Sequence, residues 1–544
     1  MTRFKLIPSY HKVFENQSFD AFAPLAGRKS ALKGETFYFA GVLETDETTL
    51  CAAIDCAFPA KAFAAESVYI KMPVYERCVD NDYLSKEPGR FPDVLRDLTE
   101  APYTLPKGIL QGLWFALSVP ADAKAGDADV TVCLKNGDGE EIARAKTSLH
   151  VIDAVLPEQK LWYTEWFHCD CLSSYYCVDP LSEAHWELIE TYAKTAVENG
   201  QNMLYMPVFT PSLDTAKGGE RPTVQLVRIT KNGDRYDFDF RLVDRWLAMC
   251  ERIGIRYHEI AHLFSQWGAA YAPKIMAVEN GETKRIFGWE TDSLSDEYIG
   301  FLKQFLSAFK AYMAGKGLLD KCLFHLSDEP VPEHLPRYLA LREKLADELD
   351  GLRCGEALSN YEFYKTGAVG TPIVGTDAIG PFLENKVPGL WAYYCCGEFE
   401  KVSNRFIAMS MNRTRVIAAQ LFKYDIAGFL QWGYNFWYCG GSKHMIDPYL
   451  TFDGLNGWVP AGDACSVYPG EDGRPVESLH LKAFTQGLQD LRAFELLASL
   501  IGKDAVVEAL EEDGVIRFDE FCRDADWCER TRDKINGMIE NALA

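Results

Sequence analysis

The sequence lacks any long apolar run. No stretch of its 544 residues approaches the roughly 18 consecutive apolar residues that a membrane-spanning helix needs. The first residues, MTRFKLIPSYHKVFENQSF, contain neither the apolar core nor the small-residue cleavage site of a secretory signal. We therefore expect a cytoplasmic protein that does not enter a membrane.

Basic residues are scarce relative to acidic ones. The chain has 56 Lys and Arg against 79 Asp and Glu, which gives a net charge of −23 and a pI near 5.0. A surface of this sign repels the phosphates of nucleic acids and of anionic membranes, so we expect neither as a partner. A neutral or cationic small ligand is compatible with this charge. The composition does not indicate an oligomeric state.

The 16 cysteines include no C-x-x-C pair, the spacing that zinc sites and thiol–disulfide centres commonly use. Several of them lie inside apolar runs: Cys250, Cys322, Cys354, Cys395 and Cys396. Without an export signal, we expect buried reduced thiols rather than a framework of disulfides.

One cluster of metal-ligating residue types needs a closer look. It contains His168, Cys169, Asp170 and Cys171, with Cys177 nearby. On a strand, alternation would point His168 and Cys169 to opposite faces, which does not suit a shared ion. We therefore expect neither a metal nor a cofactor.

A literal H-E-x-x-H motif is formed by His258, Glu259 and His262. On a helix, this spacing would hold zinc between the histidines and present the glutamate as a general base, as in zinc proteases. The preceding helical pattern stops at Gly254, however, and the apolar segment 255–264 follows where a strand is expected. On a strand, Glu259 points away from both histidines. We therefore interpret the motif as strand residues at a barrel mouth.

Residues 1–155 contain short β-rich runs separated by turn residues, and they lack long helical periodicity. The runs occupy residues 35–44, 66–76, 112–120 and 129–153. The last run contains N-G-D-G, a strong hairpin signal. We expect an N-terminal β-sandwich domain over residues 1–155.

From Leu161 onward, short apolar runs alternate with helical patterns of roughly 12 to 22 residues, which is typical of βαβ units. Candidate strands lie within segments 160–168, 202–209, 255–264, 322–330, 352–359, 371–376, 389–396 and 428–437. Helical patterns occupy 183–200, 240–254, 296–317 and 404–426, and the stretches after the fifth and sixth strands are poorer helices. We expect a multi-domain chain with an α/β (β/α)8 TIM-type barrel over residues 156–500 and a C-terminal helical segment, 501–544, packed on the barrel.

The C-terminal ends of the strands are where such barrels carry their active sites. These ends supply carboxylates, histidines and aromatic residues: Glu165, His168, Asp170, His258, His262, Asp328, Glu329, Tyr393, Trp432, Asn435 and Trp437. Aromatic faces stack on the C–H faces of a pyranose, while carboxylates bind hydroxyl groups and transfer protons. This rim predicts a site for a small glycan.

The segment F-H-L-S-D-E-P, residues 324–330, places two adjacent carboxylates at the end of an apolar strand. Two acids this close in a shielded site cannot both ionise easily, so the pKa of one should rise, as a general acid requires. A regular strand would aim Asp328 and Glu329 to opposite sides. Both can act only if the strand becomes irregular at Ser327–Asp328. The plainer alternative is an acidic cap for the helical pattern that follows.

Several motifs, in this order along the chain, resemble the catalytic domain of glycoside hydrolase family 123. They are E-W-F-H-C-D, H-L-F-S-Q-W-G-A, S-D-E-P at the end of the fourth strand, W-A-Y-Y-C-C on the seventh, G-F-L-Q-W-G-Y-N-F-W on the eighth, and W-V-P-A-G-D-A-C-S-V-Y-P-G. The resemblance spans about residues 160–500. The family comprises β-N-acetylgalactosaminidases with an N-terminal β-sandwich and a (β/α)8 barrel.

The resemblance implies a retaining exo-glycosidase with substrate-assisted catalysis, in which the 2-acetamido group of the sugar attacks its own anomeric carbon. Glu329 would be the general acid/base, and Asp328 would orient the acetamide. Tyr393 is a candidate for the acetamido oxygen. Trp391, Trp432 and Trp437 are candidate sugar platforms or pocket walls, although each could equally belong to the core. His480 stands where relatives would carry arginine, in Ser478–Leu479–His480–Leu481, which could change a subsite.

Two rival functions stay open from the sequence. A glycosidase acting on non-acetamido sugars would need a separate protein nucleophile. Glu398 lies late after the seventh strand, and Glu165 or Glu259 are the other candidates. A non-catalytic carbohydrate-binding barrel is the second rival, because fold alone does not imply catalysis. The choice between N-acetylgalactosamine and its C4 epimer, N-acetylglucosamine, is not encoded in these motifs.

Overall fold

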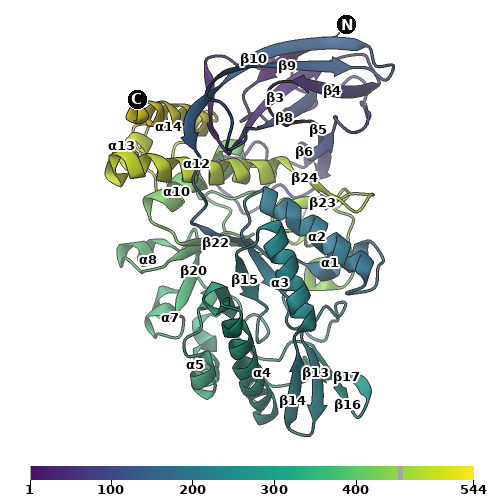
Figure 1. The fold of residues 1–544 in the computed structure, drawn as a ribbon, viewed down its shortest axis with the longest axis vertical. Coiled ribbons are helices and arrows are strands. Elements are labelled where there is room, and N and C mark those ends of the chain that lie inside the picture. Colours follow the sequence, from purple (N-terminus) through teal and green to yellow (C-terminus); the bar gives the residue numbers. More distant parts are fainter. Residues whose placement is uncertain (1, 451–456) are drawn as a thin grey trace.

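The computed structural model describes residues 2–450 and 457–544. Its N-terminal part consists of two five-stranded sheets (Figure 1). The first sheet has the order β1 (Arg3–Ile7), β3 (Thr36–Glu44), β8 (Gln111–Ser118), β5 (Ala60–Ile70), β6 (Gly89–Asp97). The second has the order β2 (Lys29–Lys33), β10 (Glu141–Val155), β9 (Gly126–Lys135), β4 (Thr49–Asp55), β7 (Tyr103–Thr104).

Both N-terminal sheets contribute to one buried apolar cluster. Alternate residues of β9, Val130, Val132 and Leu134, point into it, and Phe39 and Phe115 enter it from the other sheet. Period-two alternation of this kind is what a strand with one covered face requires. The two sheets therefore pack through a shared core, as the predicted sandwich requires.

The second part is built on eight parallel strands. They are β11 (Trp162–Glu165), β12 (Met203–Met206), β15 (Tyr257–Ile260), β18 (Cys322–His325), β19 (Cys354–Ala357), β20 (Thr371–Gly375), β21 (Trp391–Tyr393) and β22 (Gly428–Gln431). The sheet order is β11-β22-β21-β20-β19-β18-β15-β12. Each strand lies inside one of the eight segments predicted from the sequence, because fully buried parallel strands read as short apolar runs.

The barrel is nearly closed rather than continuously hydrogen-bonded. No strand pairing joins β11 to β12 among the described residues. Side-chain amides span the seam instead: Asn202 Oδ1 accepts from Tyr163 N at 2.9 Å, and Asn202 Nδ2 donates to Leu161 O at 2.9 Å. Gln201 Nε2 donates to Glu165 O at 2.9 Å. The ideal (β/α)8 closure expected from the sequence is thus replaced at one seam by two amide side chains and a single backbone bond, from Asn202 N to Tyr163 O at 3.2 Å.

Helices follow the strands along the chain. They are α1 (Cys169–Tyr175), α2 (Glu183–Glu198), α3 (Arg241–Ile253), α4 (Asp296–Gly315), α5 (Leu335–Lys344), α6 (Ala346–Leu349), α7 (Tyr361–Lys365), α8 (Gly380–Glu384), α9 (Met411–Arg415) and α10 (Ile417–Lys423). The poor helices predicted after the fifth and sixth strands are α7 and α8, of five residues each. The helix predicted over 404–426 starts later, at Met411, where the Ser410 side chain caps it.

A four-stranded sheet, order β14-β13-β16-β17, was not predicted. Its strands are β13 (Arg228–Asn232), β14 (Arg235–Asp239), β16 (Ile275–Glu279) and β17 (Glu282–Phe287). Two-residue turns connect the hairpins, Gly233–Asp234 between β13 and β14 and Asn280–Gly281 between β16 and β17. Gly233, Asn280 and Gly281 all have positive φ. Tyr236 and Phe287 pack on Phe301 of α4. The two Asn-Gly pairs were the available sequence signal.

The C-terminal part contains the hairpin β23 (Val467–Pro469) and β24 (Pro475–Glu477), and helices α12 (Leu479–Ile501), α13 (Lys503–Leu510) and α14 (Trp527–Leu543). Helix α12 lies between the N-terminal sheets and the barrel (Figure 1). His480, at its start, is fully buried with Nδ1 2.8 Å from Asp93 Oδ1 of β6. His480 therefore joins the two parts of the chain. The domain boundaries at residues 155 and 500 stay a prediction. In the structure, β10 ends at Val155 and α12 ends at Ile501.

The loop between β5 and β6, residues 71–88, extends from the N-terminal sheets to the barrel, and we call it the β5–β6 arm. Its Leu84 N donates to Ala408 O at 2.8 Å, and Asp80 pairs with Arg413 at 2.8 Å. Tyr83 OH donates to Phe399 O at 2.5 Å. The arm thereby fixes the segment that follows β21. No helix in the described part of the chain is long and apolar enough to cross a membrane.

Candidate active site

The chain is irregular just after β18, and this irregularity turns the side chains of Asp328 and Glu329 to the same side of the backbone. The strand stops at His325, and Ser327 Oγ donates to Ser265 O at 2.8 Å. Asp328 O accepts from Trp267 N at 2.9 Å. Glu329 then has φ 45°, a left-handed conformation that breaks the alternation of a strand. The strand thus becomes irregular where the sequence analysis said it must if both carboxyl groups are to act at one site.

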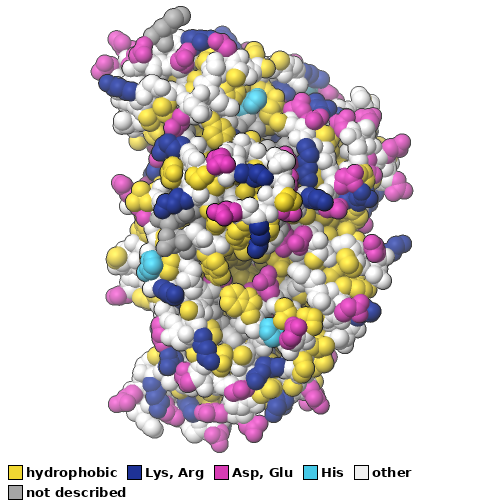
Figure 2. Space-filling view, turned by 180° about the vertical axis from the view of Figure 1, so that it is seen from behind, with side chains coloured by type: hydrophobic (Ala, Val, Ile, Leu, Met, Phe, Trp, Pro, Cys, Tyr) yellow, Lys and Arg dark blue, Asp and Glu magenta, His cyan; other side chains and the backbone are white. Residues whose placement is uncertain are grey.

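A small cavity of about 100 Å³ lies at this end of the strands. Its lining consists of Trp166, Asp214, Gln266, Trp267, Asp328, Glu329, Ala357, Tyr393, Cys395, Cys396, Leu430, Trp432, Trp458 and Val459. Figure 2 shows the molecule hollowed near the centre of one face, where apolar side chains meet acidic ones. A small concave site with apolar walls and a few convergent polar groups is the usual form of a ligand site.

Asp328 and Glu329 occupy different environments in the cavity. Asp328 is only 8% exposed, and Glu329 is half-buried. Tyr393 OH donates to Glu329 Oε1 at 2.8 Å. Burial, followed by the charges of Glu329 and Asp214, raises the pKa of Asp328 well above its usual value. The sequence predicted that the pKa of one carboxyl of the pair should rise, and the carboxyl concerned is that of Asp328.

Further carboxyl groups surround the pair. Burial raises the pKa of Asp214 to about 6, that of Asp463 to about 7 and that of Glu356 to about 8. Glu356 Oε2 accepts from Tyr338 OH and from Ser327 N, so it lies directly beneath the turn that carries Asp328. No lysine or arginine is among the described residues that line the cavity. The site therefore favours neutral or cationic ligands over anionic ones.

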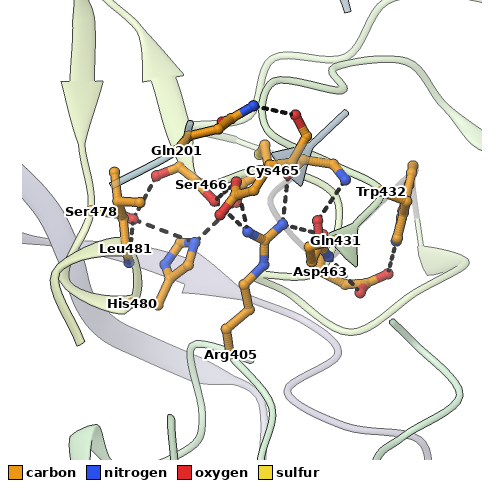
Figure 3. A network of polar contacts seen from close by, with 12 residues as sticks. Gln201, Arg405, Gln431, Trp432, Asp463, Cys465, Ser466, Ser478, His480 and Leu481 are labelled. Atoms are coloured by element: carbon orange, nitrogen blue, oxygen red, sulfur yellow. Dashed lines mark hydrogen bonds and ion pairs between the residues drawn. The ribbon is translucent and has the colours of Figure 1, made fainter. Parts of the chain in front are cut away.

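Trp432, at the end of β22, forms one wall. Its Nε1 donates to Asp463 Oδ2 at 2.9 Å, and Figure 3 shows Asp463 held from the other side by Gln431 and Arg405. Arg405 Nη2 donates to Asp463 O at 2.8 Å, and Gln431 Nε2 donates to the same oxygen at 2.8 Å. The orientation of the indole is thus fixed by a buried network, as a rigid stacking surface requires.

Two other tryptophans stand at the edge of the cavity. Trp267 is 51% exposed and Trp458 is 44% exposed. Exposed tryptophans beside a polar cavity suit the C–H faces of a sugar, because they present a large apolar surface with little side-chain entropy to lose. Tyr75 of the β5–β6 arm reaches this edge, where its hydroxyl lies 3.4 Å from Trp458 O.

Four predicted ligand-binding residues serve as buried supports instead of lining the cavity. Glu165 pairs with Arg405 at 2.9 Å. Asp170 pairs with Arg221 at 2.6 Å. Asn435 Oδ1 accepts from His168 N at 2.9 Å, and His168 Nε2 lies 3.0 Å from Trp432 O. These residues lie just behind the wall that Trp432 forms.

Two predicted tryptophans also lie away from the cavity. Trp391 pairs with Gly428 at the start of the strands, and a Cβ added at Gly428 would lie 2.1 Å from the Trp391 ring. Trp437 is fully buried against Tyr175 and Tyr192. Both tryptophans therefore lie in the core, which was the alternative that the sequence analysis left open.

The H-E-x-x-H stretch is a strand, as predicted, since β15 spans Tyr257–Ile260. The expected separation of Glu259 from His262 is wrong, however. His325 Nε2 lies 2.7 Å from Glu259 Oε1, and the His325 ring stacks on His262 at 4.5 Å. Because β15 ends at Ile260, the backbone no longer alternates and His262 turns inward. Both side chains lie under the cavity floor, next to Trp166, whose Nε1 donates to Glu259 Oε1 at 2.7 Å.

His258 is buried on β15 and lies outside the cavity lining. Burial, with a smaller contribution from Lys321, lowers the pKa of His258 to about 4. Lys321 precedes β18, so His258 lies towards the opposite end of the strands from Asp328. Among the described residues, no group of three or more His, Cys, Asp or Glu side chains is arranged so that it could hold a metal ion.

The sequence missed several cavity residues, which lie on the loops after the strands: Asp214, Gln266, Trp267, Cys395, Cys396 and Trp458. Periodicity identifies strands, but it does not predict which part of a long loop folds back over the mouth of a barrel. Asp463 and Trp458 at least lie in the W-V-P-A-G-D motif that carried the family resemblance.

Comparison with known proteins adds to this geometry. The model of the family "Glycoside hydrolase 123, catalytic domain" matches residues 166–497. A solved structure of a family 123 glycoside hydrolase from Clostridium perfringens, described for glycolipid glycan hydrolysis, has a TM-score of 0.75 at 14% identity and covers 99% of this chain and 98% of its own. A putative β-galactosidase from Bacteroides fragilis has a TM-score of 0.33 at 11% identity, over 83% of this chain and 58% of its own. No curated protein matches the chain.

Proposed function

Because the chain belongs to glycoside hydrolase family 123, and is thus a glycosidase, we propose that it releases terminal β-linked N-acetylgalactosamine with retention of configuration. The nucleophile is the 2-acetamido group of the substrate. The observation that supports this best is the turn after β18, which brings Asp328 and Glu329 into one small cavity. The carboxyl and aromatic groups that line the cavity at the strand ends suit an exo-acting enzyme that takes one terminal sugar of a small glycan.

Glu329 is the general acid/base of the proposed mechanism. It protonates the glycosidic oxygen while the acetamido carbonyl oxygen attacks the anomeric carbon from the opposite face, so that the leaving group departs and an oxazolinium ion forms. Glu329 then removes a proton from water, which attacks the same carbon and reopens the ring. The half-buried position of Glu329, with Tyr393 OH at 2.8 Å, leaves it accessible to both leaving group and water.

Asp328 accepts the acetamide N–H and stabilises the positive charge that develops on this group. An N–H donated to the carboxylate favours its ionised form, so substrate binding lowers the raised pKa of Asp328. The buried carboxyl is thereby matched to a cationic intermediate rather than to a neutral ground state, which is the requirement for transition-state stabilisation. In the proposed complex, the Tyr393 hydroxyl donates to the acetamido oxygen instead of to Glu329.

The rival mechanism needs a protein carboxylate as nucleophile, and its candidates are poorly placed. Glu165 pairs with Arg405, and Glu259 lies under the floor with His325. Burial and the charge of Asp377 raise the pKa of Glu398 well above its usual value. A carboxyl group that is held protonated is a weak nucleophile. These positions favour the substrate-assisted mechanism.

The test compares aryl β-glycosides of N-acetylgalactosamine, N-acetylglucosamine, galactose and glucose, using wild type and Asp328→Asn. We expect hydrolysis of 2-acetamido sugars only, with the β-anomer as first product by NMR, and a loss of about 10²-fold or more in kcat for the variant. Hydrolysis of plain galactosides or glucosides would require a protein nucleophile. If Glu329→Gln retained full activity, the pair would not be catalytic. If wild type hydrolysed none of the four glycosides, the barrel would be a binding protein.

A further inference from the structure

Two adjacent cysteines, Cys395 and Cys396, line the cavity, and the mechanism above uses neither of them. The sequence analysis expected both thiols to be buried and reduced. Both are free, but each is only partly buried, whereas Cys250 and Cys322 are fully enclosed. An accessible pair of thiols in a ligand cavity is a candidate modification site, and its surroundings indicate which class of reagent it would take.

Both side chains face the cavity because the chain turns just after β21. The strand ends at Tyr393, which lines the cavity, and the next residue, Tyr394, is buried in a different apolar cluster. Continued alternation would point Cys395 into the cavity and Cys396 away from it. The cavity lining contains both, so the alternation stops between them and two consecutive thiols face one space.

Contacts on both sides hold the pair in place. Cys395 N donates to Glu398 Oε2 at 2.7 Å, and Cys395 O accepts from Asn404 Nδ2 at 2.8 Å. The Cys396 thiol is hydrogen-bonded to the hydroxyl group of Tyr75, which belongs to the β5–β6 arm. The two thiols are also hydrogen-bonded to each other. Two sulfur atoms are therefore held together before any ligand arrives, which lowers the entropy cost of binding both.

The electrostatics of the cavity select the reagent. The hydrogen bond to Cys396, followed by burial and the charge of Glu398, raises the pKa of the Cys395 thiol well above its usual value. Reagents that need a thiolate, such as iodoacetamide, should therefore react slowly at this position. Anionic disulfides are repelled, because the charged side chains of the described lining are all acidic. A neutral reagent that binds two thiols together avoids both obstacles.

We propose that Cys395 and Cys396 form a binding site for neutral trivalent arsenicals, and that an arsenical bound there blocks the cavity. With phenylarsine oxide, the arsenic atom forms one As–S bond to each cysteine, the two S–H bonds break, and the oxygen atom leaves with both protons as water. Arsenic stays trivalent, so the reaction needs neither an oxidant nor a reductant. The bound group lies beside Glu329, which is close enough for its charge to act on the Cys395 thiol.

The test titrates the full chain with phenylarsine oxide and compares wild type with Cys396→Ser, which keeps a hydrogen-bonding group beside Tyr75. Intact-mass spectrometry should show that wild type carries one phenylarsenic group, in place of two hydrogens, that the variant lacks. A single thiol cannot form the chelate, so the affinity at this site should fall by about 100-fold or more. Cys395→Ser should lose the same group, which makes the result independent of the folding of either variant.

Activity is the second readout. Wild-type hydrolysis of the aryl glycoside should fall in step with occupancy and return when a small dithiol, such as dimercaptopropanol, removes the arsenic. Whatever activity Cys396→Ser retains should be insensitive to the reagent. Cys177→Ser is the matched control, because Cys177 is exposed and lies outside the cavity lining. This control should bind the arsenical and lose activity as wild type does.

Equal numbers of bound phenylarsenic groups in wild type, Cys395→Ser and Cys396→Ser would overturn the proposal, and so would full activity at full occupancy. The proposal does not depend on the proposed substrate, because the mass measurement needs no catalysis. A protein that binds the arsenical at this pair but hydrolyses no glycoside would contradict the proposed function and leave the thiol site standing.

Discussion

Glu329, the proposed acid/base, has a left-handed backbone conformation that a glutamate adopts only at a cost of about 1–3 kcal/mol. The left-handed turn is what allows two consecutive side chains to face one cavity. The surrounding contacts, Trp267 N to Asp328 O and Ser327 Oγ to Ser265 O, hold the turn against that strain. The free energy of unfolding is therefore lower than it would be if the chain had an unstrained conformation at this position.

This strain predicts which of two Glu329 variants has the larger free energy of unfolding. Both Glu329→Gly and Glu329→Ala lack the carboxylate, but only glycine adopts φ 45° without steric penalty. We expect Glu329→Gly to be more stable than Glu329→Ala by about 1 kcal/mol in urea unfolding. Equal stabilities would mean that the turn relaxes to an ordinary conformation when the carboxylate is removed.

Asp328 predicts a pH dependence of stability. Its pKa in the folded protein is raised, mainly by burial, so ionisation disfavours folding, and stability is lost as pH rises above the unfolded pKa near 3.8. Asp328→Asn removes this ionisation. We expect the variant to have a higher Tm than wild type at pH 8, with a smaller difference at pH 4, while its activity is lost. A variant less stable than wild type at pH 8 would contradict the assignment.

At the scale of elements, the side chains of Asn202 and Gln201 and one backbone bond bridge the seam between β11 and β12. Asn202→Ala leaves the buried Tyr163 N–H without its partner, while Leu161 O still accepts from Gln159 Nε2 at 3.2 Å. We expect a loss of about 1–3 kcal/mol in urea unfolding. The control is Asn385→Ala, which removes one exposed hydrogen bond to Pro381 O and should change stability by less than about 0.5 kcal/mol. Similar small losses in both would mean that strand packing alone closes the barrel.

The elements were predictable to the extent that they repeat a simple period. The buried strands read as apolar runs between helical patterns, and the end of β18 identified Asp328 and Glu329 directly. The sheet of β13, β14, β16 and β17 was not predicted because it interrupts the βαβ pattern, although the two Asn-Gly pairs at its turns are visible in the sequence. Asp214 and Trp267 lie on long loops. The path of the Asp214 loop depends on Gln266, which is distant in sequence, and on Arg221 of the same loop.

Side-chain direction was the weaker part of the sequence analysis. Trp391 and Trp437 fall on predicted strand segments, yet each packs into the core. Trp391 opens β21, at the end of the strands away from the cavity. Trp437 lies beyond the end of β22, which is shorter than its apolar run. His262 turns inward for the same reason. Alternation predicts a face only as far as the strand continues, and these strands are three to five residues long.

At the scale of the whole molecule, the N-terminal sheets and the barrel are joined by buried charges. Asp93 on β6 faces His480 on α12, and Glu35 pairs with Arg532 of α14. Bonds of this kind are costly to break on one side only, because a buried charge is left uncompensated. The two parts should therefore unfold together.

Asp93→Ala tests that coupling by calorimetry. We expect the single transition of wild type to separate into two, with a loss of about 3–5 kcal/mol for the interface. Asp127→Ala is the control, since Asp127 lies 2.6 Å from His150 Nδ1 within the N-terminal sheets and is largely exposed. It should cost less than about 1 kcal/mol. An unchanged transition in Asp93→Ala would mean that apolar packing of α12 dominates the interface.

The charged side chains that line the cavity are all acidic, and this predicts what else can enter it. We expect protonated amines that carry hydroxyl groups, such as the buffer Tris, to compete with substrate, because they combine a positive charge with sugar-like donors. Phosphate is an anion and should not compete. Rates measured in these two buffers at one pH should therefore differ, and the buffer concentration belongs in any comparison of KM values.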